Sequence, residues 1–383
     1  MNIALAFPGC HRRAGVERIM WECSRFLESR GHQVTVFANE WDDTNSGSIA
    51  HRFVPMWRQP YFLRGYSFYR NCGRLYQASD FDVLNTHGSV CPLGGVHWVQ
   101  SVQKAWLETS ARFRKPLSVA RLRQRVNPLH PVLLHLEKEH FGKRGYRKII
   151  ATTPQVKSDL MRLYGVPDQD VVIIPNGFSP TEFSPELRAA RRQESRASLG
   201  LENRDIALLF VANELERKGY YTILSAMQIL HDHRLRLLVV GRTDQQTVQR
   251  AASRFGLSNQ VRYCGSTSDI AGYHAASDLF VLPTQYEAFC LAILEALGSG
   301  LPVITSSVPG AGDAIQAGVN GAVVDDPTSA ECLARIIQPF LDFEYRQDIS
   351  GQVPGSVVSY QWPAVLANYE QVLVDNCTGI GVK

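Results

Sequence analysis

The chain has 383 residues and a formal net charge of +4, with 45% hydrophobic and 20% charged residues, which is typical of a soluble globular protein. Its length exceeds that of one ordinary domain and suits two domains of roughly 150–200 residues. No apolar run reaches the roughly 20 residues that a bilayer-spanning helix needs.

The cysteines and the N-terminus point to a reducing compartment. Eight cysteines are scattered singly and none forms a Cys-x-x-Cys pair, which argues against a zinc site and against a disulfide framework. Residues 1–7 have no basic segment ahead of their short apolar stretch, so they predict a first β-strand rather than a signal peptide. We therefore expect a cytoplasmic protein.

Strand-like apolar runs alternate with amphipathic helical runs along the chain, which predicts parallel sheets built from β-α-β units. In the first half the pattern predicts strands at 3–7, 33–38, 83–86, 96–99, 148–152 and 171–174, and helices at 16–30 and 154–164. In the second half it predicts strands at 206–212, 236–241, 261–264, 279–282, 303–305 and 322–325, and helices at 219–232, 245–255 and 360–374.

Residues 176–198 are rich in Pro, Gly, Ser and Arg and predict a linker followed by the first helix of a second unit. The sequence thus predicts an α/β protein of two Rossmann-like domains facing a central cleft. The first domain is expected to span 1–178 and the second 199–355.

The loop after the first strand has features of an anion site. Gly9 and Gly15 allow a tight turn, and His11 to Arg13 place positive charge just before a helix N-terminus. The spacing is not that of a G-x-G-x-x-G dinucleotide motif. An ordinary βα turn is the alternative interpretation.

Two histidines, His87 and His97, follow or lie within apolar strands of the first half, and we place both at strand ends. Either could hydrogen-bond a polar substrate there. A lone histidine is more often structural, and the sequence leaves the choice between the two open.

Residues 104–148 carry twelve Lys or Arg and only three Glu, interleaved with Trp, Phe and Leu. Such a stretch suits the face of an anionic membrane or an anionic acceptor. A solvated helical face and a nucleic-acid patch are the alternatives. We predict peripheral membrane or acceptor binding, and no nucleic-acid partner.

Two motifs in the second half suit a ligand site at the edge of a sheet. Arg217 and Lys218 follow a strand and come just before a helix, where paired cations can hold an anionic group without a metal. Glu287 follows the strand 279–282, and Glu295 lies about two turns along the next helix. The carboxyl edge of an open α/β sheet is where ligands bind.

These motifs carry a resemblance to a known family. The segment from Glu287 to Glu295 resembles the Glu-x7-Glu motif of retaining GT-B glycosyltransferases of family 4, the glycogen synthase-like group. The family usually reads Glu-Gly-Phe-Gly, whereas this chain reads Glu-Ala-Phe-Cys. Arg217-Lys218-Gly219 resembles the variant found in lipopolysaccharide-core glucosyltransferases. The resemblance covers nearly the whole chain and is strongest over 205–325.

The resemblance implies a role for each motif. The first domain would bind the acceptor, the second would bind the nucleotide sugar, and the helix at 360–375 would cross back onto the first. Glu287 would contact the donor sugar, Glu295 the ribose, and Arg217 with Lys218 the diphosphate. His97, or else His87, would lie near the reacting carbon. The remaining donor-binding residues that the resemblance implies are Gly15, Arg262, Tyr263, Gly265, Ala288, Phe289, Cys290 and Leu291.

The implied activity is a retaining, metal-independent transfer of a sugar from a UDP- or GDP-hexose type of donor to a cell-envelope glycan or a lipid-linked acceptor. We expect neither a metal nor a cofactor beyond the nucleotide-sugar co-substrate. Peripheral association with the inner face of the cytoplasmic membrane is expected through 104–148. The alternatives are an NAD(P)-dependent oxidoreductase on doubled Rossmann domains and a non-catalytic sugar-nucleotide-binding protein.

Overall fold

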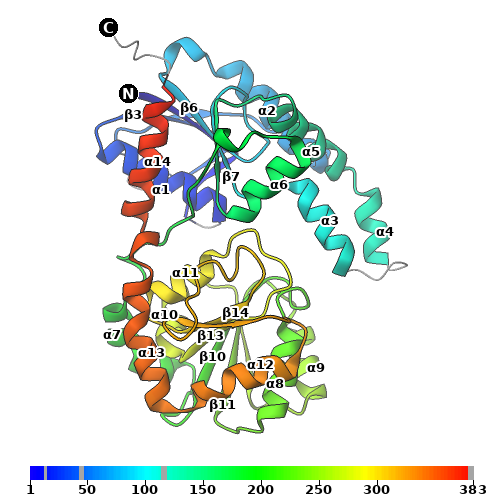
Figure 1. Ribbon diagram of the computed structural model, residues 1–383, viewed down its shortest axis with the longest axis vertical. Helices are drawn as coiled ribbons and strands as arrows, with labels where there is room; N and C mark the ends of the chain where they lie inside the picture. Colours follow the sequence, from blue (N-terminus) through cyan, green and yellow to red (C-terminus); the bar gives the residue numbers. More distant parts are fainter. Residues whose placement is uncertain (13–14, 43–46, 114–118, 378–383) are drawn as a thin grey trace. The chain divides into compact units, whose positions relative to one another are not determined.

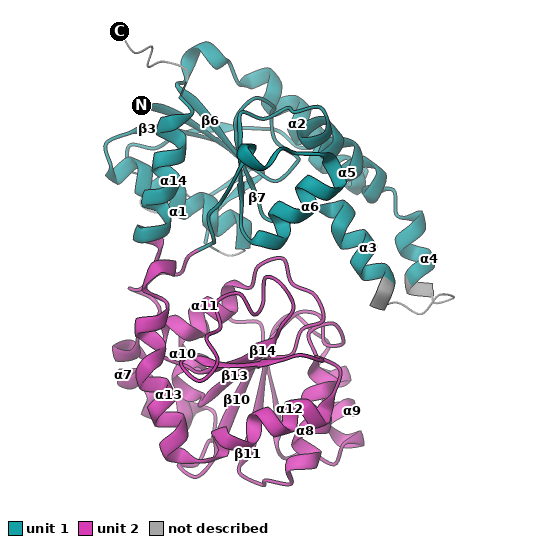
Figure 2. Ribbon diagram, in the orientation of Figure 1, with its two compact units in different colours: residues 1–176, 363–383 teal, residues 177–362 magenta. Residues whose placement is uncertain are grey.

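A computed structural model describes residues 1–12, 15–42, 47–113 and 119–377 (Figure 1). The chain divides into two compact units, and Figure 2 colours them separately. One unit comprises Met1–Asn176 with Pro363–Lys383, and the other comprises Gly177–Trp362. Each unit is built on a parallel sheet with helices, which confirms the predicted α/β class with two Rossmann-like domains.

The first unit contains a sheet with the strand order β5-β3-β1-β6-β7-β8-β9, and all its pairings are parallel. Its inner strands are almost continuously buried because helices cover both faces of such a sheet, although β6 ends in the polar residues Asn85, Thr86 and His87. The strands are β1 (Asn2–Ala6), β3 (Gln33–Ala38), β5 (Ala50–Phe53), β6 (Val83–His87), β7 (Val96–Val99), β8 (Lys148–Ala151) and β9 (Val171–Ile173), with β2 (Gly9–Cys10) and β4 (Glu40–Trp41) forming a small separate pair.

The helices of the first unit include several that the sequence pattern did not predict. The sequence predicted α1, α6 and α14 but neither α2 nor the run from α3 to α5. The edge strand β5 was also missed, because all four of its residues are exposed and leave no apolar signal. The helices are α1 (Gly15–Ser29), α2 (Arg64–Leu75), α3 (Gln103–Phe113), α4 (Val119–Val126), α5 (Leu129–Glu137), α6 (Pro154–Tyr164) and α14 (Trp362–Asp375).

The bounds of helix α6 could be predicted from the sequence because both of its ends carry local capping signals. The Thr153 hydroxyl accepts the N–H of Val156, Pro154 occupies the first turn, and Gly165 ends the helix with a left-handed φ of 65°. These are standard start and stop signals of a helix. The predicted span, 154–164, matches the observed one to the residue.

The last helix, α14, packs within the first unit although it lies at the other end of the sequence. The buried Tyr369 donates to the Asn85 side-chain oxygen at 2.9 Å, and its ring lies 5.1 Å from that of Trp98. Glu370 pairs with Arg30 at 3.1 Å and with His32 at 2.8 Å. These contacts attach the C-terminal helix to β6, β7 and the end of α1.

The second unit has the strand order β12-β11-β10-β13-β14-β15, again with parallel pairings. Within the described residues, no helix of either unit combines the length and apolar character that a bilayer crossing requires. The elements of the second unit are α7 (Pro185–Ser198), β10 (Ile206–Val211), α8 (Tyr220–Leu230), β11 (Leu235–Val240), α9 (Gln245–Arg254), β12 (Val261–Gly265), α10 (Ile270–Ala276), β13 (Leu279–Leu282), α11 (Leu291–Gly298), β14 (Val303–Ser306), β15 (Gly321–Val324), α12 (Ala330–Ile337) and α13 (Phe343–Ser356).

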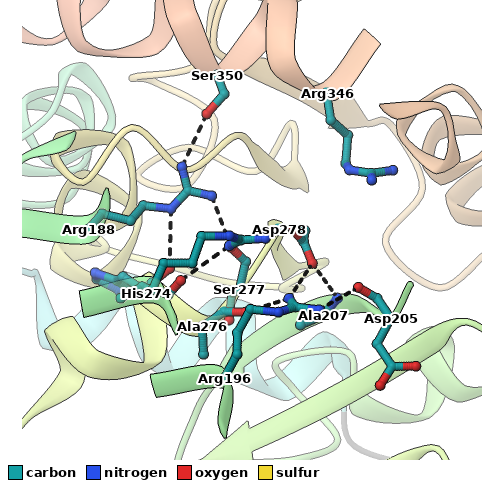
Figure 3. A network of polar contacts seen from close by, with 12 residues as sticks. Arg188, Arg196, Asp205, Ala207, His274, Ala276, Ser277, Asp278, Arg346 and Ser350 are labelled. Carbon is teal, nitrogen blue, oxygen red and sulfur yellow. Dashed lines mark hydrogen bonds and ion pairs between the residues drawn. The ribbon is translucent and has the colours of Figure 1, made fainter. Parts of the chain in front are cut away.

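The second unit begins at Gly177, earlier than the predicted start at residue 199, because α7 packs within this unit. Three arginines of α7 reach into the unit, and Figure 3 shows two of them, Arg188 and Arg196. Arg188 donates to the carbonyl oxygens of His274, Ser277 and Gly300. Arg192 and Arg196 both pair with the Asp278 carboxylate, at 2.6 and 3.2 Å.

The arginine network holds α7 through buried charge. The Asp278 carboxylate also accepts the backbone N–H of Ala207 at 2.8 Å, at the start of the central strand β10. Arg196 is 7% exposed and donates in addition to three carbonyl oxygens, those of Ala276, Glu202 and Asp205. Removing such a group would leave several buried acceptors without a partner.

We therefore expect Arg196→Ala to lower the free energy of unfolding by about 3 kcal/mol, the loss usual for one partner of a buried pair. The matched control is Arg191→Ala on the same helix, because Arg191 forms only an exposed pair with Asp269. Its loss should cost about 1 kcal/mol or less. Urea denaturation of the two variants compares them, and equal losses would contradict the assigned role of the network.

Candidate active site

The strand order of the second unit reverses between β10 and β13. The chain runs from β10 to β11 and β12 on one side, and from β13 to β14 and β15 on the other. In open parallel sheets, the crevice for a ligand lies at the carboxyl ends of the strands where such a reversal occurs. The loops after β10 and β13 border this point, and they carry the Arg217-Lys218 and Glu287 motifs.

These two loops are joined to each other. The backbone N–H of Gln285 donates to the Arg217 carbonyl oxygen at 2.9 Å, and the Arg217 guanidinium donates to the Tyr286 carbonyl oxygen at 2.5 Å. Gly219 has a φ of 87°, and a Cβ there would collide with the backbone of Pro283. Glycine is therefore required where the loops approach most closely.

An ion pair between Lys218 and Glu287 crosses the two loops. Both side chains are largely withdrawn from water, with 13% and 14% of their surface exposed. In such surroundings the attraction between the two charges is stronger than in water. The structure thus brings together two residues that lie far apart in the sequence, both of them predicted for the donor site.

The Arg217 guanidinium forms several hydrogen bonds within the protein, which the sequence did not predict. In addition to the Tyr286 carbonyl oxygen, its guanidinium binds the Glu214 carboxylate with two hydrogen bonds of 3.0 Å. One quarter of its side chain is exposed. Arg217 therefore braces the loop that carries Lys218, and Lys218 is the cation that lies directly against Glu287.

Helix α11 begins at Leu291, directly after the Glu287 loop. Its N-terminus presents backbone N–H groups and a positive dipole end toward this edge. The resemblance implied that residues 289–291 bind the donor, and for Cys290 the structure gives its backbone N–H another partner. The Cys290 N–H donates to the Gly310 carbonyl oxygen at 3.1 Å, so it caps the loop instead.

The loop containing Gly310 lies over the Glu287 segment. Gly310 has a φ of 82°, and a Cβ there would come within 2.5 Å of the Ala288 carbonyl oxygen and 2.8 Å of that of Glu287. Ala288 and Cys290 stand where the family usually has glycines. The Cys290 side chain is buried in this loop. Burial, and then the nearby Glu287 carboxylate, raises the pKa of the Cys290 thiol to about 12.

The sequence did not identify the buried polar residues that bond to the backbone of this loop. Thr284 is fully buried, and its hydroxyl donates to the Tyr286 carbonyl oxygen at 2.9 Å. The buried Ser306 hydroxyl donates to the Thr284 carbonyl oxygen at 2.5 Å. Hydroxyl residues at or near the ends of apolar strands could have drawn attention to both positions.

Glu295 lies on α11 eight residues after Glu287 and is half-buried. Its carbonyl oxygen accepts both the backbone N–H and the hydroxyl of Ser299, at 3.0 and 2.9 Å. These bonds close the C-terminal end of α11 one turn after Glu295. The position of Glu295 therefore depends on how α11 is held.

Among the residues that the resemblance assigned to the donor, the exposed Arg262 bonds to a neighbouring helix end instead. Its guanidinium donates to the Leu199 carbonyl oxygen at 2.6 Å, at the end of α7. Arg262 thus braces α7 against β12. Tyr263 donates to the Thr243 carbonyl oxygen at 2.7 Å, and Gly265, with a φ of 72°, ends β12 at the carboxyl edge.

In the first unit, the strand order reverses between β1 and β6. Gly15 is the first residue of α1, beyond the loop that follows β1. The predicted anion site also includes Arg13, which lies outside the described residues. A Cβ on Gly9 would come within 2.7 Å of the Glu17 side chain, so this loop folds back onto the first turn of α1.

Comparison with known proteins adds evidence from both halves of the chain. Residues 13–182 match the family described as Glycosyltransferase Family 4, and residues 191–352 match Glycosyl transferases group 1. A crystal structure of WaaG, a glycosyltransferase involved in lipopolysaccharide biosynthesis, matches 99% of this chain and 100% of its own with a TM-score of 0.81 at 21% identity. The chain belongs to the family 4 glycosyltransferases of the GT-B fold.

Two further matches extend the family relationship. The lipopolysaccharide glucosyltransferase WaaG of Escherichia coli is 27% identical over 208 residues, 54% of this chain and 56% of that protein. Anabaena HepE in complex with UDP-glucose has a TM-score of 0.70 at 18% identity, covering 98% of this chain and 100% of its own. The aligned stretch spans only about half the length of the first curated relatives.

One of the two candidate histidines, His87, lies at a strand end as predicted, and the other, His97, does not. His97 is near the start of β7 rather than at its end, is 1% exposed, and has its Nδ1 2.5 Å from the Thr86 hydroxyl. Its ring lies 4.6 Å from that of His140. His87 does end β6, but it is fully buried and stacks 5.5 Å from Trp98.

These histidines are neutral in the folded unit. Burial lowers the pKa of His87 to about 3 and that of His140 to about 4, and it lowers the pKa of His97 well below its usual range. The geometry therefore gives both candidates a structural position in the core. Neither side chain is exposed to a ligand in the described part of the first unit.

This burial predicts a pH dependence of stability. The unfolded chain protonates each histidine near pH 6.5, whereas the folded chain does not, so folding is fully favoured above pH 6.5 and weakens below it. Each buried histidine should remove about 1.4 kcal/mol per pH unit between pH 6.5 and its folded pKa. Urea denaturation from pH 7.5 to 4.5 measures this slope. His87→Phe should reduce this slope by the contribution of one proton, and an unchanged slope in this variant would contradict the prediction.

Proposed function

We propose that this chain is a retaining glycosyltransferase that moves a hexose from a UDP- or GDP-hexose to a cell-envelope glycan or a lipid-linked acceptor. The observation that carries the proposal is the Lys218–Glu287 pair at the strand-order reversal, with Glu295 on the helix that follows. Family membership favours this function over dinucleotide-dependent oxidation and over simple binding.

The ion pair suggests how the donor is engaged. A nucleoside diphosphate brings negative charge to Lys218 and competes with Glu287 for it. Glu287 then has carboxylate oxygens available for the hydroxyls of the donor sugar. In this way the diphosphate and the sugar would be recognised together, since each takes one member of the pair as its partner.

Helix α11 supplies the remaining donor contacts in this proposal. Its positive N-terminal end stabilises the phosphate next to the sugar. Glu295 accepts hydrogen bonds from the ribose hydroxyls. Arg217 adds positive charge beside the diphosphate while it holds the Lys218 loop to Tyr286.

The proposed reaction needs no protein base and no metal. The bond from the sugar C1 to the diphosphate oxygen breaks as the acceptor oxygen forms its bond to C1 on the same face. The leaving phosphate oxygen takes the acceptor's proton, and Lys218 with the α11 N-terminus stabilises the charge that develops on the diphosphate. Exclusion of water would suppress hydrolysis of the donor.

Relatives support the class of donor and acceptor. WaaG of Escherichia coli is a lipopolysaccharide glucosyltransferase, and HepE has been seen in complex with UDP-glucose. A hexose donor and an envelope acceptor are therefore our proposal for this chain as well.

Glu295→Ala and Lys218→Ala should each weaken nucleotide-sugar binding by tenfold or more, about the loss of one charged hydrogen bond. Isothermal titration with UDP-, GDP-, ADP- and TDP-sugars measures this, with NAD(P) as a negative control and Glu344→Ala as a surface control. Excess EDTA should leave the binding and transfer unchanged. Binding of NAD(P) alone, or equal binding by Glu295→Ala, would overturn the proposal.

We also propose that the helices α3 to α5 attach the protein to the inner face of the cytoplasmic membrane. Helix α4 carries Arg121, Arg123 and Arg125, and its Leu122 and Val126 are 62% and 69% exposed. A cavity of about 330 Å³ between the three helices is lined by both apolar and basic side chains. Such a surface suits anionic lipid headgroups and the apolar layer below them.

Reversing the charge at Arg121, Arg123 and Arg125 should abolish sedimentation with vesicles that contain phosphatidylglycerol at low salt. Each basic residue near such a surface contributes about 1 kcal/mol. The same reversal at Arg242, Arg250 and Arg254, which are exposed in the second unit, should leave binding unchanged. If both triple variants sediment like the wild type, α4 does not bind membrane.

A further inference from the structure

The chain leaves the second unit at two places, before Gly177 and after Trp362, and these two segments are bonded to each other. The Phe178 N–H donates to the Tyr360 carbonyl oxygen at 2.9 Å, and the Trp362 N–H donates to the Phe178 carbonyl oxygen at 2.9 Å. A Cβ on Gly177 would lie 2.7 Å from the Trp362 ring. We call Gly177–Phe178 with Tyr360–Trp362 the connector.

The connector packs directly against the C-terminal end of α11. Phe178 is 3% exposed, and its ring covers Gly298, the last residue of the helix. A Cβ on Gly298 would collide with this ring, with the Cζ atom at 3.0 Å and two ring carbons closer still. Only glycine lets α11 approach Phe178 so closely, and Glu295 lies one turn earlier on the same helix.

The N-terminal end of α11 is held by the loop that contains Gly310 and Asp313. Burial, and then the charge of the Asp313 carboxylate, raises the pKa of Tyr360 in the connector. The Asp313 carboxylate accepts the N–H of Gly310 at 3.1 Å. Gly310 in turn accepts the N–H of Cys290, the residue before α11. The Gly310 loop therefore holds the N-terminal end of α11, and the connector packs against its C-terminal end.

We propose that Phe178 is a positioning residue for the donor site: through its contact with Gly298, the connector sets the position of α11 and therefore of Glu295. Since packed interiors deform little, a displacement of the connector is passed to α11. Conversely, a donor held by Glu295 would favour one arrangement of the connector. This inference rests on the proposed function, because Glu295 is assigned to the donor.

Gly298→Ala tests the contact directly. Alanine at a helical glycine normally favours the helix, so any loss must come from the collision with Phe178. We expect about a tenfold rise in the dissociation constant for UDP-glucose, or for GDP-mannose if the wild type prefers it, measured well below the melting temperature. We also expect faster amide hydrogen exchange in the peptide covering residues 287–298.

A rescue variant and a control variant test whether the Phe178 ring causes the effect of Gly298→Ala. Phe178→Leu in the Gly298→Ala background opens room for the new methyl group and should restore most of the affinity. Gly351→Ala on α13 is the matched control, because a Cβ there meets nothing within 4 Å, and it should leave both measurements unchanged. If Gly298→Ala does not fold, Phe178→Leu alone should still increase exchange in 287–298.

The outcomes distinguish the connector inference from the proposed donor site. Wild-type affinity and exchange in Gly298→Ala, with weakened binding in Glu295→Ala, would overturn the connector inference alone. Unchanged affinity in Glu295→Ala would overturn the donor site itself. Weakened binding by Gly298→Ala without rescue by Phe178→Leu would also contradict the inference, since the ring would then not be the cause.

Discussion

The reversal of strand order between β10 and β13 is the constraint on which the second unit's site depends. Because the strands are parallel, their carboxyl ends meet at one edge, and the reversal directs the loops after β10 and β13 to the same point. Their close approach requires Gly219, and it brings Lys218 against Glu287. Two motifs separated by about seventy residues become one site through the topology alone.

The packing around that site serves to hold α11 in one place. Below the Glu287 loop, the hydroxyls of Thr284 and Ser306 satisfy buried carbonyl oxygens. At the other end of α11, the His274 ring bonds the Ser299 hydroxyl at 3.0 Å, and Arg188 binds the Gly300 carbonyl oxygen. The arginine network of α7 thus braces the same helix that carries Glu295. The residues that stabilise this unit therefore also hold the helix on which the proposed donor contact of Glu295 lies.

Local patterns predicted much of this architecture. Strands β3, β7 and β13 and helix α6 were predicted to the residue, because each is bounded by turn or capping residues and has a clear apolar pattern. The Glu287, Glu295, Arg217 and Lys218 set was also identified from motif and context. The exposed strand β5 was missed because it gives no apolar signal. The helices α2 to α5 were also missed, although α2 is as amphipathic as the predicted helix α1.

The sequence by itself determined the α/β class, the two-domain organisation and the identity of the charged motifs, because these depend on apolar periodicity and short-range spacing. Only the tertiary structure decided which groups meet. It paired Lys218 with Glu287, engaged Arg217 and Arg262 with carbonyl oxygens, and buried His97 beside His140. Those outcomes depend on contacts between residues distant in the chain, and the burial that sets their charge state arises only when the chain has folded.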